Sequence, residues 1–417
     1  MIKRPLANKL SIAPVLTWLV PLLLVLFTLS GGQEKVSTGL PWPKRIADSF
    51  LARHSGAVTY DSGSPGQKWN YEQGLVLVSL VRMWQHSGDR KYFDFVRANL
   101  DRYISESGSI RTYALADYNL DNIAPGRALL SAYEETHQEK FHSAADTLRR
   151  QLRAQPRTRE GGFWHKKIYP YQMWLDGLFM AEPFYARYAA MFGDSVAFDD
   201  ITDQFIWIAR HATDPKTGLL FHAWDESKQE RWAHPQTGCS PALWGRAIGW
   251  YAMGLVDVLD DVPKNHPKRQ NLISIFKNLA DALIRCRDEQ THLWYQVIDQ
   301  GKRSGNYLES SASCMFVYCL AKGSRMGYLD RKFVKLAEDS FEGIVHRETT
   351  IDARGFVDLH GTCGATGLGG RPYRDGSFEY YTGVPQRTND LRGIGAFLLA
   401  AIELENASPA TTTRGGQ

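Results

Sequence analysis

Cysteine is scarce in this chain of 417 residues, and the five that occur follow no recognisable pattern. They are an odd number and include no C-x-x-C pair: Cys239, Cys286, Cys314, Cys319 and Cys363. Disulfide-stabilised small domains and structural zinc sites need denser and more regular cysteines. The sequence therefore excludes both classes of protein, and it permits one disulfide whose partners it leaves open.

Runs of one charge are absent after residue 10. The chain has 49 Lys and Arg against 45 Asp and Glu, a net charge of +4, with both signs interspersed. Nucleic-acid-binding proteins concentrate basic side chains in clusters or stripes. We therefore expect no nucleic-acid partner, and we favour a monomer because no feature of the sequence indicates an assembly.

Only one long uncharged apolar run is present, at residues 12–30. Lys3, Arg4 and Lys9 precede it, and small residues follow it. This order is typical of a secretory signal peptide, and the run is also long enough to anchor the chain if it is not cleaved. We expect residues 1–32 to be a signal peptide or N-terminal membrane anchor. The rest would then be extracytoplasmic, periplasmic or secreted, and would touch a membrane only through that segment.

Apolar residues recur at helical spacing along most of the chain, whereas the alternation typical of strands is rare. Pro183 falls inside the sixth segment and should kink or split it. The predicted helices are 44–54, 70–87, 91–105, 120–136, 138–153, 172–191, 197–213, 241–260, 268–287, 309–326, 330–348 and 390–405.

Every second predicted helix opens with polar or aromatic residues rather than with a plain capping sequence. Alternate helices of this kind predict an inner ring whose N-termini face one cavity, inside an outer ring of more charged helices. The expected fold is all-α, an (α/α)6 barrel of six helical hairpins forming one catalytic domain over residues 40–405. Residues 406–417 are of low complexity and should be disordered. The openings are Trp69-Asn-Tyr71, Leu120-Asp-Asn122, Trp174-Leu-Asp176, Trp244-Gly-Arg246, Glu309-Ser-Ser311 and Asn389-Asp390.

Two carboxylates, Asp121 and Asp176, lie at the starts of adjacent inner helices. Apolar neighbours should raise the pKa of Asp176 toward that of a proton donor at neutral pH, while a helix N-terminus would lower it. Asp121 has more polar neighbours and should ionise more readily. Two carboxylates in differing environments are typical of glycoside chemistry. The alternative is that each merely caps its helix.

Histidine and arginine residues in and beside the long loops are further candidates. His165 and His222 lack the spacing of metal ligands, so we expect neither a metal nor a cofactor, and either histidine could instead be a surface hydrogen-bonding residue. Arg246 lies between Trp244 and Trp250, where a guanidinium fork beside aromatic rings suits a sugar that carries a carboxylate. The alternative for Arg246 is an ion pair with an acid on a neighbouring helix.

Several spaced motifs follow one another along the chain: Trp174-x-Asp-Gly-x-Phe-Met180, His222-Ala-Trp-Asp225, Ser240-Pro-x-x-Trp-Gly-Arg-x-x-Gly-Trp250, Glu309-Ser-Ser-Ala-Ser313, Gly367-Leu-Gly-Gly370 and Asp375-Gly-Ser-x-Glu-Tyr-Tyr381. Together, and over about residues 45 to 405, they resemble glycoside hydrolase family 105. Its members are unsaturated rhamnogalacturonyl hydrolases, and they are similar in fold to the unsaturated glucuronyl hydrolases of family 88.

The resemblance implies a metal-free, exo-acting hydrolase that removes a 4,5-unsaturated uronic acid from the non-reducing end of polysaccharide-lyase products. Such an enzyme protonates the C4=C5 vinyl ether and adds water at C5. By position in the motifs, Asp176 would be the general acid/base and Asp121 a second essential carboxylate. The implied substrate-binding residues are Tyr71, His165, Trp174, His222, Trp244, Arg246 and Trp250, with Tyr71 the weaker match.

Rhamnogalacturonan disaccharides from pectin are the favoured substrate. A glucuronyl hydrolase acting on glycosaminoglycan or ulvan oligosaccharides is the nearest alternative. A carbohydrate-binding helical barrel without catalysis is an alternative of another class. A barrel enzyme that cleaves within saturated polymers is a third, and it would need an open groove in place of a pocket.

Overall fold

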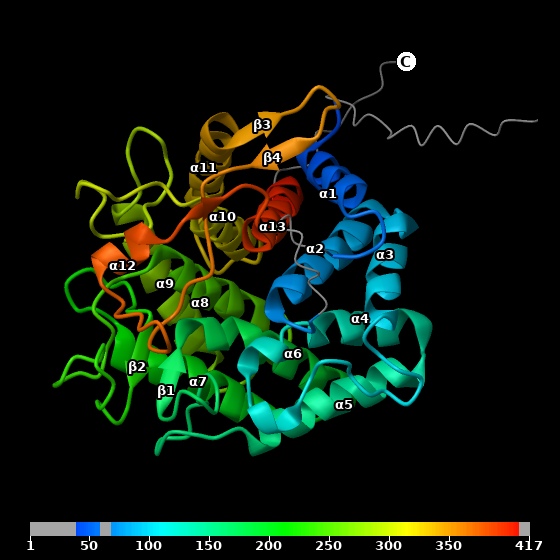
Figure 1. The fold of residues 1–417 in the computed structure, drawn as a ribbon, viewed down its shortest axis with the longest axis horizontal. Coiled ribbons are helices and arrows are strands. Elements are labelled where there is room, and N and C mark those ends of the chain that lie inside the picture. Colours follow the sequence, from blue (N-terminus) through cyan, green and yellow to red (C-terminus); the bar gives the residue numbers. More distant parts are fainter. Residues whose placement is uncertain (1–38, 59–67, 408–417) are drawn as a thin grey trace, which may run out of the picture. The chain divides into compact units, whose positions relative to one another are not determined.

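Six helices form a closed inner ring in the computed structural model, which describes residues 39–58 and 68–407 (Figure 1). Each packs against the next, and the last packs against the first. Most residues of the last four are buried, as expected for helices that are apolar on all sides. The inner helices are α2 (Tyr71–Ser87), α4 (Gly126–Thr136), α6 (Leu175–Phe192), α8 (Gly245–Val258), α10 (Ser310–Arg325) and α13 (Leu391–Ala407).

An outer layer of amphipathic helices covers this ring. Helix α5, for example, buries Phe141, Leu148 and Leu152 on one face and exposes charged residues on the other. The two layers make an (α/α)6 barrel, so the predicted fold is confirmed. The outer helices are α1 (Trp42–Arg53), α3 (Arg90–Asp101), α5 (Glu139–Ala154), α7 (Ala197–Ala212), α9 (Arg269–Arg285) and α11 (Lys332–Glu348).

Two predicted helices start differently from the expectation. Within 120–136, residues Leu120–Asn122 form a short 3-10 turn (η2), and α4 begins only after Pro125. Proline lacks an N–H and suits the start of a helix rather than its interior. Within 172–191, residues Gln172–Trp174 form strand β1, which pairs antiparallel with β2 (Ala223–Asp225). That pairing joins distant segments, so local periodicity did not reveal it.

The expected interruption at Pro183 does not split its helix, because α6 is continuous from Leu175 to Phe192. At the other end of the chain, α13 continues through Ala407, past the predicted end at residue 405. The long loops hold the remaining short elements: η1 (Leu115–Asp117), β3 (Thr349–Ile351) paired with β4 (Val357–Leu359), β5 (Thr362–Cys363) paired with β6 (Gln386–Arg387), and α12 (Phe378–Gly383).

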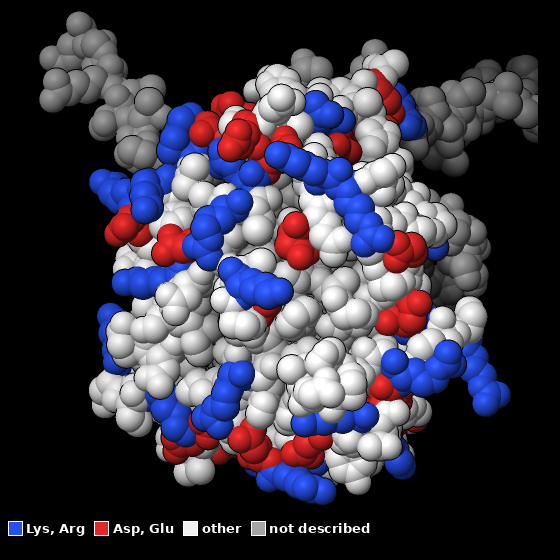
Figure 2. Space-filling view, turned by 90° about the vertical axis from the view of Figure 1, so that its left-hand side faces the viewer, with Lys and Arg blue, Asp and Glu red and all other residues white. Residues whose placement is uncertain are grey.

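The predicted signal peptide or anchor, residues 1–32, lies outside the described residues, as do residues 408–417 of the predicted disordered tail 406–417. The first two residues of that tail, 406 and 407, instead belong to α13. Among the helices that are described, none has the length and apolar character needed to cross a membrane. Basic and acidic side chains are intermixed on the face shown in Figure 2. This distribution agrees with the alternating charges of the sequence.

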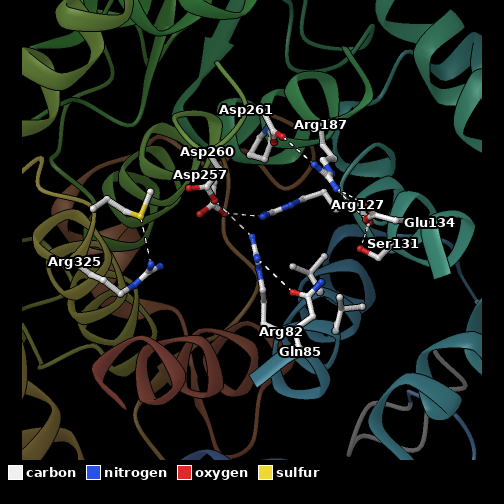
Figure 3. A pocket seen from close by; sticks show the side chains of 14 residues that line it. Arg82, Gln85, Arg127, Ser131, Glu134, Arg187, Asp257, Asp260, Asp261 and Arg325 are labelled. Carbon is white, nitrogen blue, oxygen red and sulfur yellow. Dashed lines mark hydrogen bonds and ion pairs between the residues drawn. The ribbon is translucent and has the colours of Figure 1, made fainter. Parts of the chain in front are cut away.

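A cavity of about 380 Å³ lies inside the ring at the C-terminal ends of the inner helices (Figure 3). Charged side chains that line this cavity pair with one another and with the buried Lys322 beside it. Asp257 accepts from Lys322 (2.6 Å) and contacts Arg127 (2.9 Å), while Lys322 also reaches Asp260 (2.7 Å). We call Arg127, Asp257, Asp260 and Lys322 the basal cluster. These pairs join α4, α8 and α10 and hold that end of the barrel together.

Candidate active site

Asp176 is positioned by the junction of β1 and α6. The strand ends at Trp174 and the helix begins at Leu175, which puts Asp176 in the first helical turn. The backbone N–H of Leu175 donates to the carbonyl of His222 (3.0 Å), at the start of the paired strand β2. Nε2 of His222 lies 3.0 Å from Oδ2 of Asp176, and the histidine is fully buried. The β1–β2 pairing therefore brings two predicted site residues into contact.

Asp121 is held in the short turn η2. Its backbone N–H donates to the side chain of Asn119 (3.0 Å). Its carboxylate lies 2.5 Å from Nζ of Lys166 and 3.4 Å from Nε2 of His165. The backbone N–H of Leu120 also donates to the carbonyl of His165 (3.1 Å). The loop that carries His165 and Lys166 is thus fastened to the turn that carries Asp121.

His165 links the two carboxylates. It is 2% exposed, and the charges of both Asp121 and Asp176 act on it. Gly177 allows this packing, since a Cβ at that position would lie 3.2 Å from Nδ1 of His165 and 3.1 Å from a methyl group of Leu120. The structure therefore gathers the two predicted carboxylates around one buried histidine.

Burial and charge set the protonation of these groups in the substrate-free protein. Burial lowers the pKa of His165 to about 4, with Asp121 opposing, so this ring is neutral at pH 7. Burial acts to raise the pKa of Asp176, but His222, His165 and a backbone hydrogen bond outweigh it and leave that pKa below the usual value. Burial alone would lower the pKa of Lys166, yet the Asp121 carboxylate raises it overall. Asp176 is thus ionised and Lys166 cationic before substrate binds.

Aromatic rings form the walls beside the two histidines. Trp174 stacks on His165 at 4.6 Å between ring centroids and on Tyr169 at 4.8 Å. Trp244 lies 4.8 Å from the His222 ring. Both tryptophans are at least 95% buried, so they fix the histidine rings and exclude water more than they offer an open platform.

Trp250 and Tyr71 contact each other inside the ring. Trp250 is 1% exposed, packs against Phe179 (4.7 Å) and meets Tyr71 edge-on (6.2 Å). Burial raises the pKa of the Tyr71 hydroxyl, and the charges of Arg392 and Asp121 are among those that act on it. Both residues thus belong to the same end of the barrel as Asp121. Their direct contact with a substrate stays a prediction.

Arg246 has partners in the protein. Its Nη1 donates to the carbonyl oxygen of Cys363 and its Nη2 to that of Gly364 (2.6 Å), while Glu309 lies 4.0 Å away. The side chain is 1% exposed and stacks over Trp244. In the substrate-free protein the guanidinium fork therefore secures the loop around residues 363–364. Its binding of a substrate carboxylate stays a prediction.

The sequence reasoning did not single out three residues that complete the site. Lys166 contacts Asp121, as described above. The hydroxyl of Tyr381 on α12 lies 2.7 Å from Nδ1 of His222. Gln296 accepts from the indole of Trp244 (3.0 Å) and donates to the carbonyl of Tyr381 (3.0 Å). A signal existed for two of them, because Lys166 follows His165 directly and Tyr381 ends one of the quoted motifs.

The arrangement suits acid–base chemistry on a small ligand. One carboxylate, Asp176, has an imidazole partner, and the other, Asp121, has an ammonium partner. A carboxylic acid in such a setting can deliver a proton and later take one back. Within residues 39–58 and 68–407, no group of three or more His, Cys, Asp or Glu side chains could hold a metal ion.

Several known proteins are similar to this chain in sequence, and solved structures are similar to it in fold. Residues 42–408 match the model of Glycosyl Hydrolase Family 88. A family 105 glycoside hydrolase from C. acetobutylicum ATCC 824 is 43% identical and superposes with a TM-score of 0.84, covering 88% of this chain and 100% of that one. Protein Atu3128 of Agrobacterium fabrum is 36% identical over 230 residues, 54% of this chain and 97% of that protein.

A further relative has a name that states its activity. The unsaturated rhamnogalacturonyl hydrolase YesR of Bacillus subtilis is 25% identical over 264 residues, which are 62% of this chain and 72% of that protein. The family match covers most of the chain and coincides with the described barrel. The chain therefore belongs to glycosyl hydrolase family 88, within the group of families 88 and 105 that contains the unsaturated glycuronyl and rhamnogalacturonyl hydrolases, and it is a glycoside hydrolase.

Proposed function

We propose that this enzyme removes a 4,5-unsaturated uronic acid from the non-reducing end of oligosaccharides made by polysaccharide lyases. Rhamnogalacturonan disaccharides are the favoured substrates, in keeping with the name of the Bacillus subtilis relative. The enzyme would act outside the cytoplasm, as the N-terminal segment of the sequence suggests.

The contacts of Asp176 are the observation that supports this function best. Its carboxylate has a buried imidazole at 3.0 Å, and a second carboxylate, Asp121, lies across His165. A hydration reaction needs one group that first gives a proton to carbon and then takes one from water. Asp176 has the chemistry and the partners for both roles.

The proposed reaction conserves atoms and charge at each step. Asp176 in its acid form gives a proton to C4, the double bond supplies the electrons, and C5 becomes an oxocarbenium ion stabilised by the ring oxygen. A water molecule adds its oxygen to C5 and returns a proton to Asp176. The product is a hemiketal at C5. Its ring opens to a ketone at C5 and a hemiacetal at C1, and the hemiacetal collapses to an aldehyde, with its hydroxyl proton passing to the leaving oxygen of the next sugar. Asp121 and Lys166 would bind the sugar and keep its C4 within reach of Asp176.

The lowered pKa of Asp176 in the free protein puts a condition on this mechanism, because the first step needs the acid form. A bound uronate brings a negative charge close to Asp176, and a like charge raises the pKa of a carboxyl group. A sugar bound beside Asp176 also displaces water from the carboxyl group and favours the neutral acid. Substrate binding would thus supply the proton donor that the free enzyme lacks.

Loss of the ultraviolet absorbance of the C4=C5 bond measures the reaction directly. We expect turnover on a panel of unsaturated disaccharides from several lyases, fastest with the rhamnogalacturonan product. Asp176→Asn should reduce kcat by about 10² to 10⁴-fold, the usual contribution of a general acid. Asp89→Asn is the matched control, because Asp89 caps α3 far from the site and asparagine caps equally well.

Two outcomes would overturn the proposal. One is an unchanged absorbance on every disaccharide of the panel. The other is a product formed in deuterated water that carries no deuterium at C4, because that label records protonation of the double bond. Full activity in Asp176→Asn would refute the role assigned to that residue.

A further inference from the structure

A continuous chain of polar groups leads from α12 to Asp176. The hydroxyl of Tyr381 lies 2.7 Å from Nδ1 of His222, and Nε2 of the same ring lies 3.0 Å from Oδ2 of Asp176. Tyr381 and His222 are both fully buried. No bulk water is therefore available to replace either contact, so each partner fixes the hydrogen-bonding state of the next.

Tyr381 is held in place by contacts other than those with His222. Ser377 caps the start of α12 by accepting from the N–H of Tyr380 (3.1 Å). Gln296 donates to the carbonyl of Tyr381 (3.0 Å), and Trp244 stacks on its ring at 5.4 Å and 15°. The hydroxyl is therefore presented to His222 by a rigid surround and needs no substrate for its orientation.

The direction of the hydrogen bonds follows from proton counting. Oδ2 of Asp176 faces Nε2 of His222, and a carboxylate oxygen is an acceptor, so this contact needs a proton on Nε2. In the imidazole tautomer whose single N–H is at Nε2, Nδ1 is the acceptor. Burial raises the pKa of Tyr381 well above its usual value, so its hydroxyl keeps the proton that Nδ1 needs.

We propose that Tyr381 is a positioning residue whose hydroxyl donates to Nδ1 of His222 and thereby keeps the single imidazole proton on Nε2, facing Oδ2 of Asp176. In the substrate-free protein Nε2 and Oδ2 are in contact but not yet aligned as a hydrogen bond. Such contacts commonly tighten when substrate binds.

The arrangement has a consequence for the proton that takes part in the reaction, and this step rests on the function proposed above. Oδ2 of Asp176 is buried and faces His222, so a proton destined for the substrate must reside on Oδ1. When Oδ1 is protonated, Oδ2 still accepts from Nε2. His222 therefore needs no change of tautomer during the cycle, and the acid keeps one orientation in both of its protonation states.

Tyr381→Phe tests the role in catalysis, since it removes the hydroxyl and keeps the ring stack. We expect kcat to fall about tenfold, the cost of one lost hydrogen bond, with KM within about twofold of wild type. His222 would then hold its proton on Nε2 less firmly, and burial would raise the pKa of Asp176 with less opposition. The acid form in the enzyme–substrate complex then persists to higher pH, so the alkaline limb of the kcat profile, which reports that complex, should move to higher pH.

Tyr380→Phe is the matched control. Its hydroxyl accepts from the N–H of Gly367 (3.2 Å) and has no contact with His222, so both kcat and the pH profile should stay as in wild type. Wild-type kinetics and an unshifted alkaline limb in Tyr381→Phe would overturn the proposal. The other titratable or charged groups acting on this chain are His165, Cys363, Tyr380 and Arg374, which both variants retain apart from the Tyr380 hydroxyl itself.

Nitrogen-15 NMR of labelled histidines in the substrate-free, full-length protein gives a readout independent of activity. The His222 signals, assigned by their loss in His222→Asn, should show a protonated Nε2 and an unprotonated Nδ1. Tyr381→Phe should show a mixture of tautomers. A wild-type ring protonated on Nδ1 would refute the positioning role whatever the substrate. Failure of turnover on every unsaturated disaccharide would instead refute the proposed reaction and leave this tautomer measurement standing.

Discussion

The two ends of the inner ring both bury acidic side chains, but they partner them differently. At the base, Asp257 meets the formal cations Lys322 and Arg127, and the Tyr318 hydroxyl also donates to it (2.6 Å). At the mouth, Asp176 meets the imidazoles of His222 and His165, and only His222 is in direct contact.

The difference shows in the protonation of the two carboxylates. Burial acts to raise the pKa of Asp257, but Lys322 and Arg127 lower it far below the usual range, so this group has no accessible acid form. The pKa of Asp176 is lowered by weaker partners that a bound anion can counteract. A buried carboxylate is therefore no sign of catalysis by itself. The sign is a partner that leaves the carboxylate able to change its charge.

Removing an ion pair from the basal cluster should cause the largest loss of stability among the changes considered. Lys322→Met leaves Asp257 buried beside Arg127 alone, and removing one partner of a buried ion pair typically costs about 3–5 kcal/mol. Chemical denaturation should show this loss, while kcat of the protein that remains folded should change little. Lys335→Met is the control, because its pair with Asp339 is exposed, screened by solvent and should contribute little to stability. Equal losses in the two variants would contradict the comparison.

Acidification should distinguish the two ends through His165. An unfolded histidine binds its proton near pH 6.5, whereas burial lowers the pKa of His165 to about 4. Between these values the unfolded chain binds more protons, so stability falls as the pH is lowered, by up to ~3 kcal/mol for this group. Asp257, whose folded pKa is depressed, keeps its contribution throughout that window and loses it only at lower pH.

The measurement is the free energy of unfolding against pH from 7 to 4, in wild type and in His165→Gln. Because His54, whose pKa burial also lowers to about 4, titrates in both proteins, the difference between the curves isolates His165. In the variant, the free energy of unfolding should fall less steeply with decreasing pH, by the amount that corresponds to the binding of about one proton. Parallel curves would show that His165 is already protonated in the folded state. The charged groups facing His165 are Asp121, Lys166, Asp176 and His222.

The smallest effect is expected from replacing Lys166. This residue lies at the same end of the ring as Asp176, but like Lys322 at the other end it pairs an ammonium group with a carboxylate. Lys166→Met should lower kcat/KM about tenfold, since one charged hydrogen bond to Asp121 is worth roughly 1.5 kcal/mol or more. Lys167→Met, an exposed neighbour, should stay within about twofold. Steady-state kinetics on an unsaturated disaccharide decides between them. A stability loss without a kinetic effect would make the Lys166 pair structural, like those of the base.

The fold was largely predictable because its helices carry strong local periodicity. The twelve predicted segments correspond to α1–α11 and α13, and alternate helices do form the inner ring. The errors fall where a distant partner decides the structure. β1 exists because β2 pairs with it, and the 3-10 turn η2 is held by the loop of His165. The short helix α12 lies inside a Gly- and Tyr-rich loop whose pattern gave no period to detect.

The site was predictable to a lesser degree. The sequence pointed to both carboxylates and both histidines, yet several of their partners come from far along the chain. Tyr381 reaches His222 from α12, and Arg246 meets carbonyls of the 363–364 loop. From the sequence, apolar neighbours act to raise the pKa of Asp176 and a helix N-terminus acts to lower it, so the net direction stayed open. His222 lowers the pKa of Asp176 because the pairing of β1 with β2 brings the two residues together, and that pairing cannot be read from either segment alone.

The closure of the ring by α13 also bears on how the enzyme is made. This helix leaves the ribosome after the other five inner helices, and until it docks the apolar seam between α2 and α10 stays open to water. The joint is tight, because a Cβ on Gly395 would lie 2.5 Å from a side-chain carbon of Leu75. Arg392, near the start of α13, contacts Tyr71 and Glu72 at the mouth. Nascent chains therefore keep this apolar seam exposed until α13 has been made, and exposed apolar surface of this kind favours chaperone binding.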